Sequence, residues 1–170
     1  MGCIRICNFA FGVEIWRLWT MKKAEKIEEM VRGLGGTGSG LDPCYEGYFT
    51  CFNSQQYYEA HDVLEHLWLQ TRDANHAFYK GLIQLAGAFV HLQKQFQRPA
   101  HPKDGGRARP AARLFKLAAR NLAPYRPRHL RLDVERVWTM ATTLAREIAD
   151  GGYRNPWTPE TAPTIRLEAA

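Results

Sequence analysis

Cysteine is scarce in this sequence, with four residues in 170 and no Cys-x-x-Cys pair. A disulfide-stapled secreted domain is shorter and denser in cysteine, so we expect reduced thiols and a cytoplasmic protein. Long hydrophobic runs are also missing from the start of the chain. Charged residues interrupt the apolar first twenty positions, and the longest uncharged run there, Ile6–Val13, is far shorter than the roughly 20 residues that span a bilayer. The sequence therefore predicts no transmembrane segment.

Strand alternation, internal repeats and the common local signatures of enzymes are missing as well. The chain has no Gly-rich phosphate loop, no nucleophile elbow and no His-Glu-x-x-His zinc-protease motif. It also lacks the Glu-x-x-His repeats of di-iron bundles. Its 45% hydrophobic and 24% charged residues are those of an ordinary globular protein, which disfavours intrinsic disorder.

Met21 marks a change in composition, because it opens the polar helical pattern MKKAEKIEEMVRGL after an apolar segment. We interpret it as the true translation start, with a short amphipathic helix on a membrane surface as the alternative for residues 1–20. GLGGTGSG (33–40) has the composition of a flexible linker. The sequence thus predicts an N-terminal extension over 1–40 and a folded domain over 41–167.

Within that domain, apolar spacing predicts an all-α bundle of about five helices. Asp42-Pro43 is a plausible helix start, and Asn53 or Ser54 is expected to cap the second helix. The most apolar segment, 75–97, has a hydrophobic arc so wide that it is expected to be the central helix. The proline-containing C-terminus is expected to run extended over the bundle surface. The helices are expected over 44–53, 54–71, 75–97, 110–122 and 134–150, after a short charged helix over 22–33.

Chemistry-capable residues concentrate in YYEAHDVLEHLW (57–68). His61 and Glu65 are four residues apart and are therefore neighbours on a helix. They lie on the same side of this helix as Leu64 and Trp68, so the pair is expected to face or border the packed interior. The opposite, wetter face is expected to hold a second polar set: Glu59, Asp62 and His66.

The central helix carries a matching polar stripe within about 60° of arc: Lys80, Gln84, His91 and Gln95. Helices joined by a short turn pack antiparallel, so His61 and Glu65 are expected to meet Gln84 and His91. Three interpretations follow: a structural hydrogen-bond network, a pocket for a small ligand, or a metal site. A divalent metal would use His61, Glu65 and His91, and the enzyme it suggests is a metal-assisted hydrolase. The candidate site residues are Glu59, His61, Glu65, Trp68, Gln84 and His91.

Basic residues are concentrated in one stretch of the chain. Twenty-three Lys and Arg against seventeen Asp and Glu give a net charge of +6. Residues 98–131 contain ten basic residues and one acid, Asp104. This stretch is typical of a solvated connection, and a nucleic-acid partner is the less favoured interpretation because aromatic residues and a known motif are lacking.

Two motifs, FNxxxYYEAHDVLExLW (52–68) and FYKGLIQLAxAxxHL (78–92), resemble domain-of-unknown-function family 309. AARLF (111–115), YRPxxLxLDV (125–134) and PTIRL (163–167) extend the resemblance over about 44–167. It implies a small all-helical bundle, common in bacteria and archaea, without an established activity. Gln55, Asp62 and Lys80 depart from the family pattern, which usually has Gly, Glu and Gln there. The family's motif residues map onto Glu59, His61, Glu65, Trp68, Gly81, Gln84 and His91.

The sequence thus favours a non-enzymatic helical domain whose His/Glu/Gln cluster serves structure, a small ligand or a protein partner. The metal-assisted hydrolase is the alternative, and a nucleic-acid-associated protein acting through 98–131 is a further one. A divalent metal is the cofactor that the cluster suggests. No specific partner is indicated, and association into a homo-oligomer is left open.

Overall fold

The computed structural model describes Glu25, Glu29 and residues 40–169. The chain divides into two units, residues 1–35 and 36–170, and the fold below is that of the second unit. The proposed start at Met21, the 33–39 part of the linker and the segment 1–20 lie outside the described residues. Of the helix expected over 22–33, only Glu25 and Glu29 are described, and both are helical and exposed.

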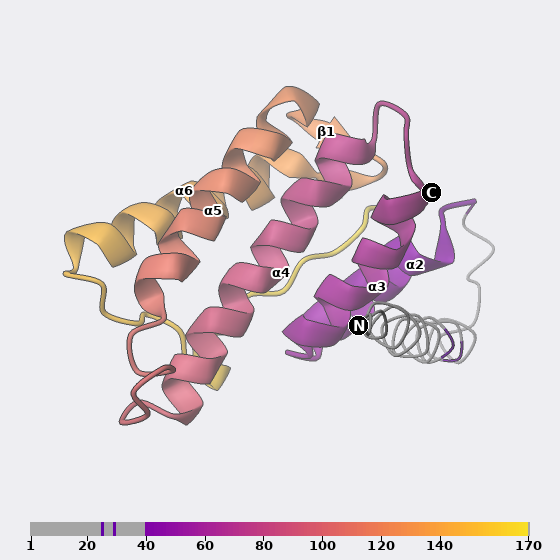
Figure 1. The fold of residues 1–170 in the computed structure, drawn as a ribbon. Helices are drawn as coiled ribbons and strands as arrows, with labels where there is room; N and C mark the ends of the chain where they lie inside the picture. The colour runs from indigo at the N-terminus through magenta and orange to yellow at the C-terminus, as the bar shows by residue number, and fades with distance from the viewer. Residues whose placement is uncertain (1–24, 26–28, 30–39, 170) are drawn as a thin grey trace, which may run out of the picture. The chain divides into compact units, whose positions relative to one another are not determined.

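Five α-helices make up most of the described chain, and each packs against the helix that follows it in sequence (Figure 1). α4 lies between α3 and α5, which confirms the central helix expected over 75–97. The all-α bundle that the sequence predicts is confirmed. The helices are α2 (Pro43–Asn53), α3 (Tyr57–Gln70), α4 (His76–Gln97), α5 (Ala108–Leu122) and α6 (Val134–Asp150).

α2 begins where the sequence predicts. The Asp42 carboxylate accepts a hydrogen bond from the Cys44 N–H at 2.8 Å, and Pro43 occupies the first turn, where its missing N–H costs nothing. One face of this helix then buries a row of aromatic rings, and the Tyr48 hydroxyl donates to the Leu82 carbonyl of α4 at 2.9 Å. Burial of these large rings holds α2 against the rest of the bundle.

The apolar arc of α4 is buried along most of its length, but not at its end. Phe78, Leu82 and Leu85 are fully buried, whereas Phe96, expected on the same face, is 45% exposed. At this end of α4, Trp157 of the tail packs edge-on against the Phe96 ring at 5.5 Å between centroids and leaves much of the ring exposed.

A two-stranded hairpin, β1 (Arg128–His129) and β2 (Leu132–Asp133), precedes α6 and was not predicted. Its two turn residues, Leu130 and Arg131, have φ values of 44° and 61°, the left-handed region that L-residues rarely adopt. The Tyr45 hydroxyl holds the Leu130 carbonyl at 3.1 Å. Strands of two residues are too short to show the alternation from which strands are predicted.

The C-terminal tail runs extended across the bundle, as the sequence predicts, and Figure 1 shows it passing behind α4. Trp157 is 4% exposed, and its indole N–H donates to the Tyr57 hydroxyl at 3.2 Å. Either Asn53 or Ser54 was predicted to cap the second helix, and that prediction is wrong: Ser54 ends α2, and Asn53 contacts the tail. Its amide instead exchanges two hydrogen bonds, each 2.8 Å long, with the backbone of Ile165, and α3 has no side-chain cap.

The sequence predicts reduced thiols and no transmembrane segment, and the structure bears on both predictions. Cys44 and Cys51 are free thiols, and Cys51 is buried as a small apolar side chain. Cys3 and Cys7 lie outside the described residues. None of the described helices combines the length and the apolar character that crossing a bilayer demands.

Candidate functional site

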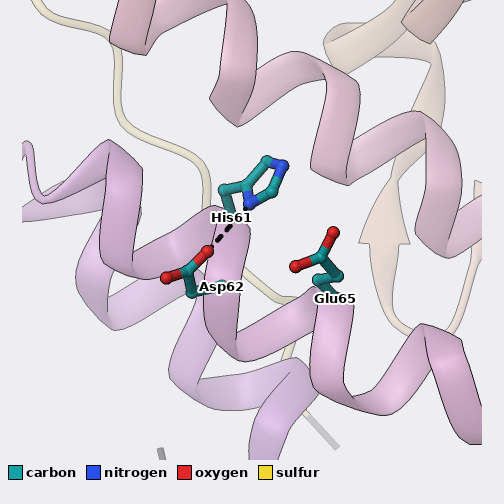
Figure 2. A group of neighbouring side chains, drawn as sticks. All are labelled: His61, Asp62 and Glu65. Atoms are coloured by element: carbon teal, nitrogen blue, oxygen red, sulfur yellow. Dashed lines mark hydrogen bonds and ion pairs between the residues drawn. The ribbon is translucent and has the colours of Figure 1, made fainter. Parts of the chain in front are cut away.

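Three side chains of α3 bring potential metal ligands together: His61, Asp62 and Glu65. One donor atom from each lies within 4.8 Å of the other two, and all three residues are half-buried. Figure 2 shows the imidazole and the Glu65 carboxylate projecting from the same side of α3, with Asp62 reaching toward the imidazole. His61 and Glu65 lie close together because residues four apart are neighbours on a helix. We call this set the α3 cluster.

The hydrogen bond between His61 and Asp62 orients the imidazole. The atoms His61 Nδ1 and Asp62 Oδ1 are 3.1 Å apart. An ionised carboxylate can only accept, so Nδ1 donates in this bond and the neutral ring keeps its lone pair on Nε2. The Tyr58 ring stacks on the imidazole at 6.5 Å between centroids and restricts it further.

Asp62 belongs to the cluster, although its sequence position predicted the opposite, wetter face. Its side chain is 15% exposed, against 31% for His61. A carboxylate directly after the histidine can curl back to Nδ1, which a helical wheel drawn from Cα directions does not show. Asp62 is therefore a member of the site that sequence reasoning missed.

The α3 cluster faces α4 at a glycine. A Cβ added at Gly87 would lie 3.9 Å from His61 Cδ2 and 3.4 Å from Leu114 Cδ1. Gly87 thus sits where side chains of α3 and α5 converge.

His91 does not join the cluster. Its Nδ1 accepts a hydrogen bond from Arg107 Nη1 at 3.2 Å, since a guanidinium can only donate. Burial lowers the pKa of His91, and the positive charges of Arg107 and Lys94 lower it further. Arg107 is in turn held by the buried Asp104 carboxylate at 2.5 Å. This histidine is therefore an uncharged hydrogen-bond acceptor for the loop before α5.

Gln84 and Gln95 of the α4 stripe also face α5 and that loop, whereas Lys80 lies beside Trp68 of α3. Gln84 Oε1 accepts from the Asn121 amide at 2.8 Å, and Gln95 Oε1 accepts from the Ala108 N–H at 2.6 Å. The expected meeting of His61 and Glu65 with Gln84 and His91 is thus replaced by contacts between α4 and α5. These polar residues satisfy one another across that interface.

The remaining candidates lie apart from the cluster. Glu59 lies close enough to Cys51 that its charge adds to the effect of burial, which raises the pKa of that thiol. Trp68, one turn after Glu65, packs against His76 at 4.9 Å between ring centroids, and Lys80 Nζ lies 6.0 Å from its ring. Its buried Nε1 has no hydrogen-bond partner among the described residues.

His129 is a half-buried residue that packs against the aromatic side chains of the bundle. Its ring packs edge-on against Phe78 at 4.7 Å, and its Nε2 lies 2.7 Å from Asn75 Oδ1. Burial lowers its pKa, so the neutral ring is favoured. The polar residues around His129 in the sequence give no sign of this contact, because it is the hairpin that places the ring beside Phe78.

Residues 45–101 match the family model of DUF309, a domain of unknown function. This confirms the resemblance. The DUF309 match covers most of α2 and all of α3 and α4, and with them the α3 cluster. The extension of the resemblance to 102–167 stays a prediction. No curated protein and no solved structure matches the chain.

Proposed function

We propose that this chain is a non-enzymatic binding domain and that the α3 cluster takes a divalent transition-metal ion. The observation that carries the proposal is the mutual approach of three potential ligand atoms to within 4.8 Å on a half-buried helix face. The DUF309 match supports an uncharacterised domain and favours no particular activity.

The donor set suits such an ion. One imidazole and two carboxylates form a mixed nitrogen and oxygen set, which Zn²⁺ and Mn²⁺ accept and which is too rich in nitrogen for Ca²⁺ or Mg²⁺. Three protein ligands from one helix leave coordination positions for water or for a bound molecule. Because the three side chains are half-buried, water competes less for an ion bound there, and the ion can still enter from solvent.

The test is titration of tag-free protein with Zn²⁺ in a competition assay against a chromogenic chelator. We expect one equivalent to bind to the wild type, and His61→Ala to weaken this binding by at least about 100-fold through loss of a ligand. His66→Ala is the matched control, because His66 lies on the same helix outside the cluster and contacts Gln70. Equal binding by wild type and His61→Ala would refute the proposal.

His91→Ala separates this ligand set from the one expected from sequence. Because His91 is engaged by Arg107, we expect the variant to bind Zn²⁺ as the wild type does while losing stability. An unfilled Arg107 donor costs about 1–3 kcal/mol. Loss of Zn²⁺ in His91→Ala would instead favour the set His61, Glu65 and His91.

A metal-assisted hydrolase is the second candidate, and the His61–Asp62 hydrogen bond favours it. A carboxylate that holds Nδ1 orients the ring so that Nε2 could coordinate a metal ion, and such an ion would supply an activated water for hydrolysis. The readout is hydrolysis of a chromogenic phosphate diester by Zn²⁺-loaded protein. Turnover that disappears in both His61→Ala and Asp62→Asn would replace the binding domain by the enzyme.

A further inference from the structure

The ten basic residues of 98–131 do not form one surface, because half of them are engaged within the fold. Two arginines hold Asp104, one holds Glu135 and two hold Glu168 through its carboxylate or its carbonyl. These side chains fix the α4–α5 loop, the hairpin and the tail. The engaged residues are Arg98, Arg107, Arg126, Arg128 and Arg131.

Four of the others line the outer face of α5. Arg109, Arg113, Lys116 and Arg120 are all exposed, and their i, i+4, i+7, i+11 spacing places them within about 60° of arc. The opposite face of α5 is buried and rich in alanine. Arg109 lies over the Tyr153 ring at 4.0 Å, while the other three form no ion pair with any residue that the structure describes.

A groove runs beside this row, between α5 and α6. Two hollows of about 370 and 140 Å³ share Lys116 and Ala149 and therefore adjoin. Arg146 of α6 adds a fifth cation, and Asp150 is the acidic residue among those that line the two hollows. Alanines make up much of the remaining lining: Ala112, Ala119, Ala145 and Ala149.

We propose that the α5–α6 basic face binds the phosphate backbone of duplex nucleic acid without reading its sequence. The row spans about 16 Å, which corresponds to about five nucleotide steps of one strand at 3.4 Å each. Arginine forks match phosphate oxygens in pairs, and three of the four cations on α5 are arginines. This proposal uses residues outside the α3 cluster and stands independently of the metal site.

The surroundings of the row favour a duplex over other anions. Single strands are held by stacking of bases on exposed aromatic rings, and the nearby Tyr153 is covered by Arg109. Anionic membranes favour a face that adds apolar side chains to its charges. The described large apolar side chains that are exposed lie instead on α3 and the end of α4: Tyr58, Leu69 and Phe96.

The experiment measures fluorescence anisotropy of a labelled 20-base-pair duplex of random sequence at several salt concentrations. About four phosphate contacts give a slope of log affinity against log salt near −4, or a loss on the order of 100-fold between 50 and 200 mM. Arg113→Gln with Lys116→Gln should reduce the slope to about −2, because two contacts are removed. The same slope on an unrelated duplex sequence supports backbone binding.

The matched control is Arg136→Gln with Arg166→Gln, which removes the same charge from the cleft between α6 and the tail. We expect this control to keep the wild-type slope. Absence of duplex binding at 50 mM salt, or an equal change in both double variants, would overturn the proposal. So would binding to vesicles containing phosphatidylserine with no binding to the duplex, because the partner would then be a membrane.

Discussion

At the scale of single residues, the half-buried histidines His91 and His129 respond to acid in the same direction. The pKa of His91 is lowered by burial and by Arg107 and Lys94, and that of His129 is lowered by burial. Each ring is therefore easier to protonate in the unfolded chain than in the fold. Proton uptake by the unfolded chain then lowers the free energy of unfolding as pH falls below about 6.5.

The change that isolates this effect is His91→Gln, whose amide oxygen can still accept from Arg107 but does not titrate. Between pH 7.5 and 5.5 we expect the free energy of unfolding to fall less in the variant than in the wild type. Asp104 does not contribute to the stability change between these pH values. Its pKa is lowered, chiefly by the hydrogen bond from Arg107, so it titrates at more acidic pH. Urea unfolding at both pH values measures the difference. The same acid loss in both proteins would contradict the assigned neutral His91.

At the scale of helices, local periodicity predicts each segment but not which neighbour each face meets. The helix 75–97 and its polar stripe were predicted from spacing alone, and the helix is confirmed. Gln84 and Gln95 of the stripe face α5, where Asn121 and the Ala108 N–H supply partners. α3 and α5 both flank α4, so the rotation that brings Gln84 to one or the other depends on packing that no helical wheel contains.

Alanine substitutions at two glycines of α4, Gly81 and Gly87, test how closely α4 packs against its neighbours. A Cβ at Gly81 would lie 2.8 Å from Leu122 Cγ and 3.3 Å from the Ala118 carbonyl oxygen, whereas a Cβ at Gly87 meets only ordinary contacts. Alanine stabilises a helix interior by about 1 kcal/mol relative to glycine, and overpacking costs about 1–3 kcal/mol. We expect Gly87→Ala to raise the free energy of unfolding and Gly81→Ala to lower it.

Chemical denaturation of the two variants provides this comparison within one helix. Because the substitution and the helix are the same, the difference reports the surroundings of the two positions, chiefly the close approach of Leu122 and Ala118 to Gly81. A Gly81→Ala variant as stable as Gly87→Ala would contradict the close contact with Leu122.

At the scale of the whole molecule, the tail connects elements that are distant in sequence. Trp157 contacts Tyr57, and Ile165 pairs with Asn53, 112 positions earlier. Prolines predicted an extended tail, but nothing local in the sequence indicates which groups it meets. This is also why Asn53 was assigned as a cap: its short-range role is visible in sequence and its long-range partner is not.

Removing the tail's main anchor should weaken the entire bundle. We expect Trp157→Ala to lower the free energy of unfolding by about 3–5 kcal/mol, because it empties a buried site and orphans the Tyr57 hydroxyl. Arg154→Ala, an exposed change three residues earlier, should stay within about 0.5 kcal/mol of the wild type. Equal stability of the two variants in urea would show that the tail only lies on the surface.

The most direct test of the central claim, that the α3 cluster holds a divalent ion, is anomalous diffraction at the zinc absorption edge from crystals grown with Zn²⁺. We expect one strong peak between the side chains of His61, Asp62 and Glu65, lost in His61→Ala crystals. A peak beside His91, or zinc bound only at crystal contacts while His61 keeps its hydrogen bond to Asp62, would contradict it.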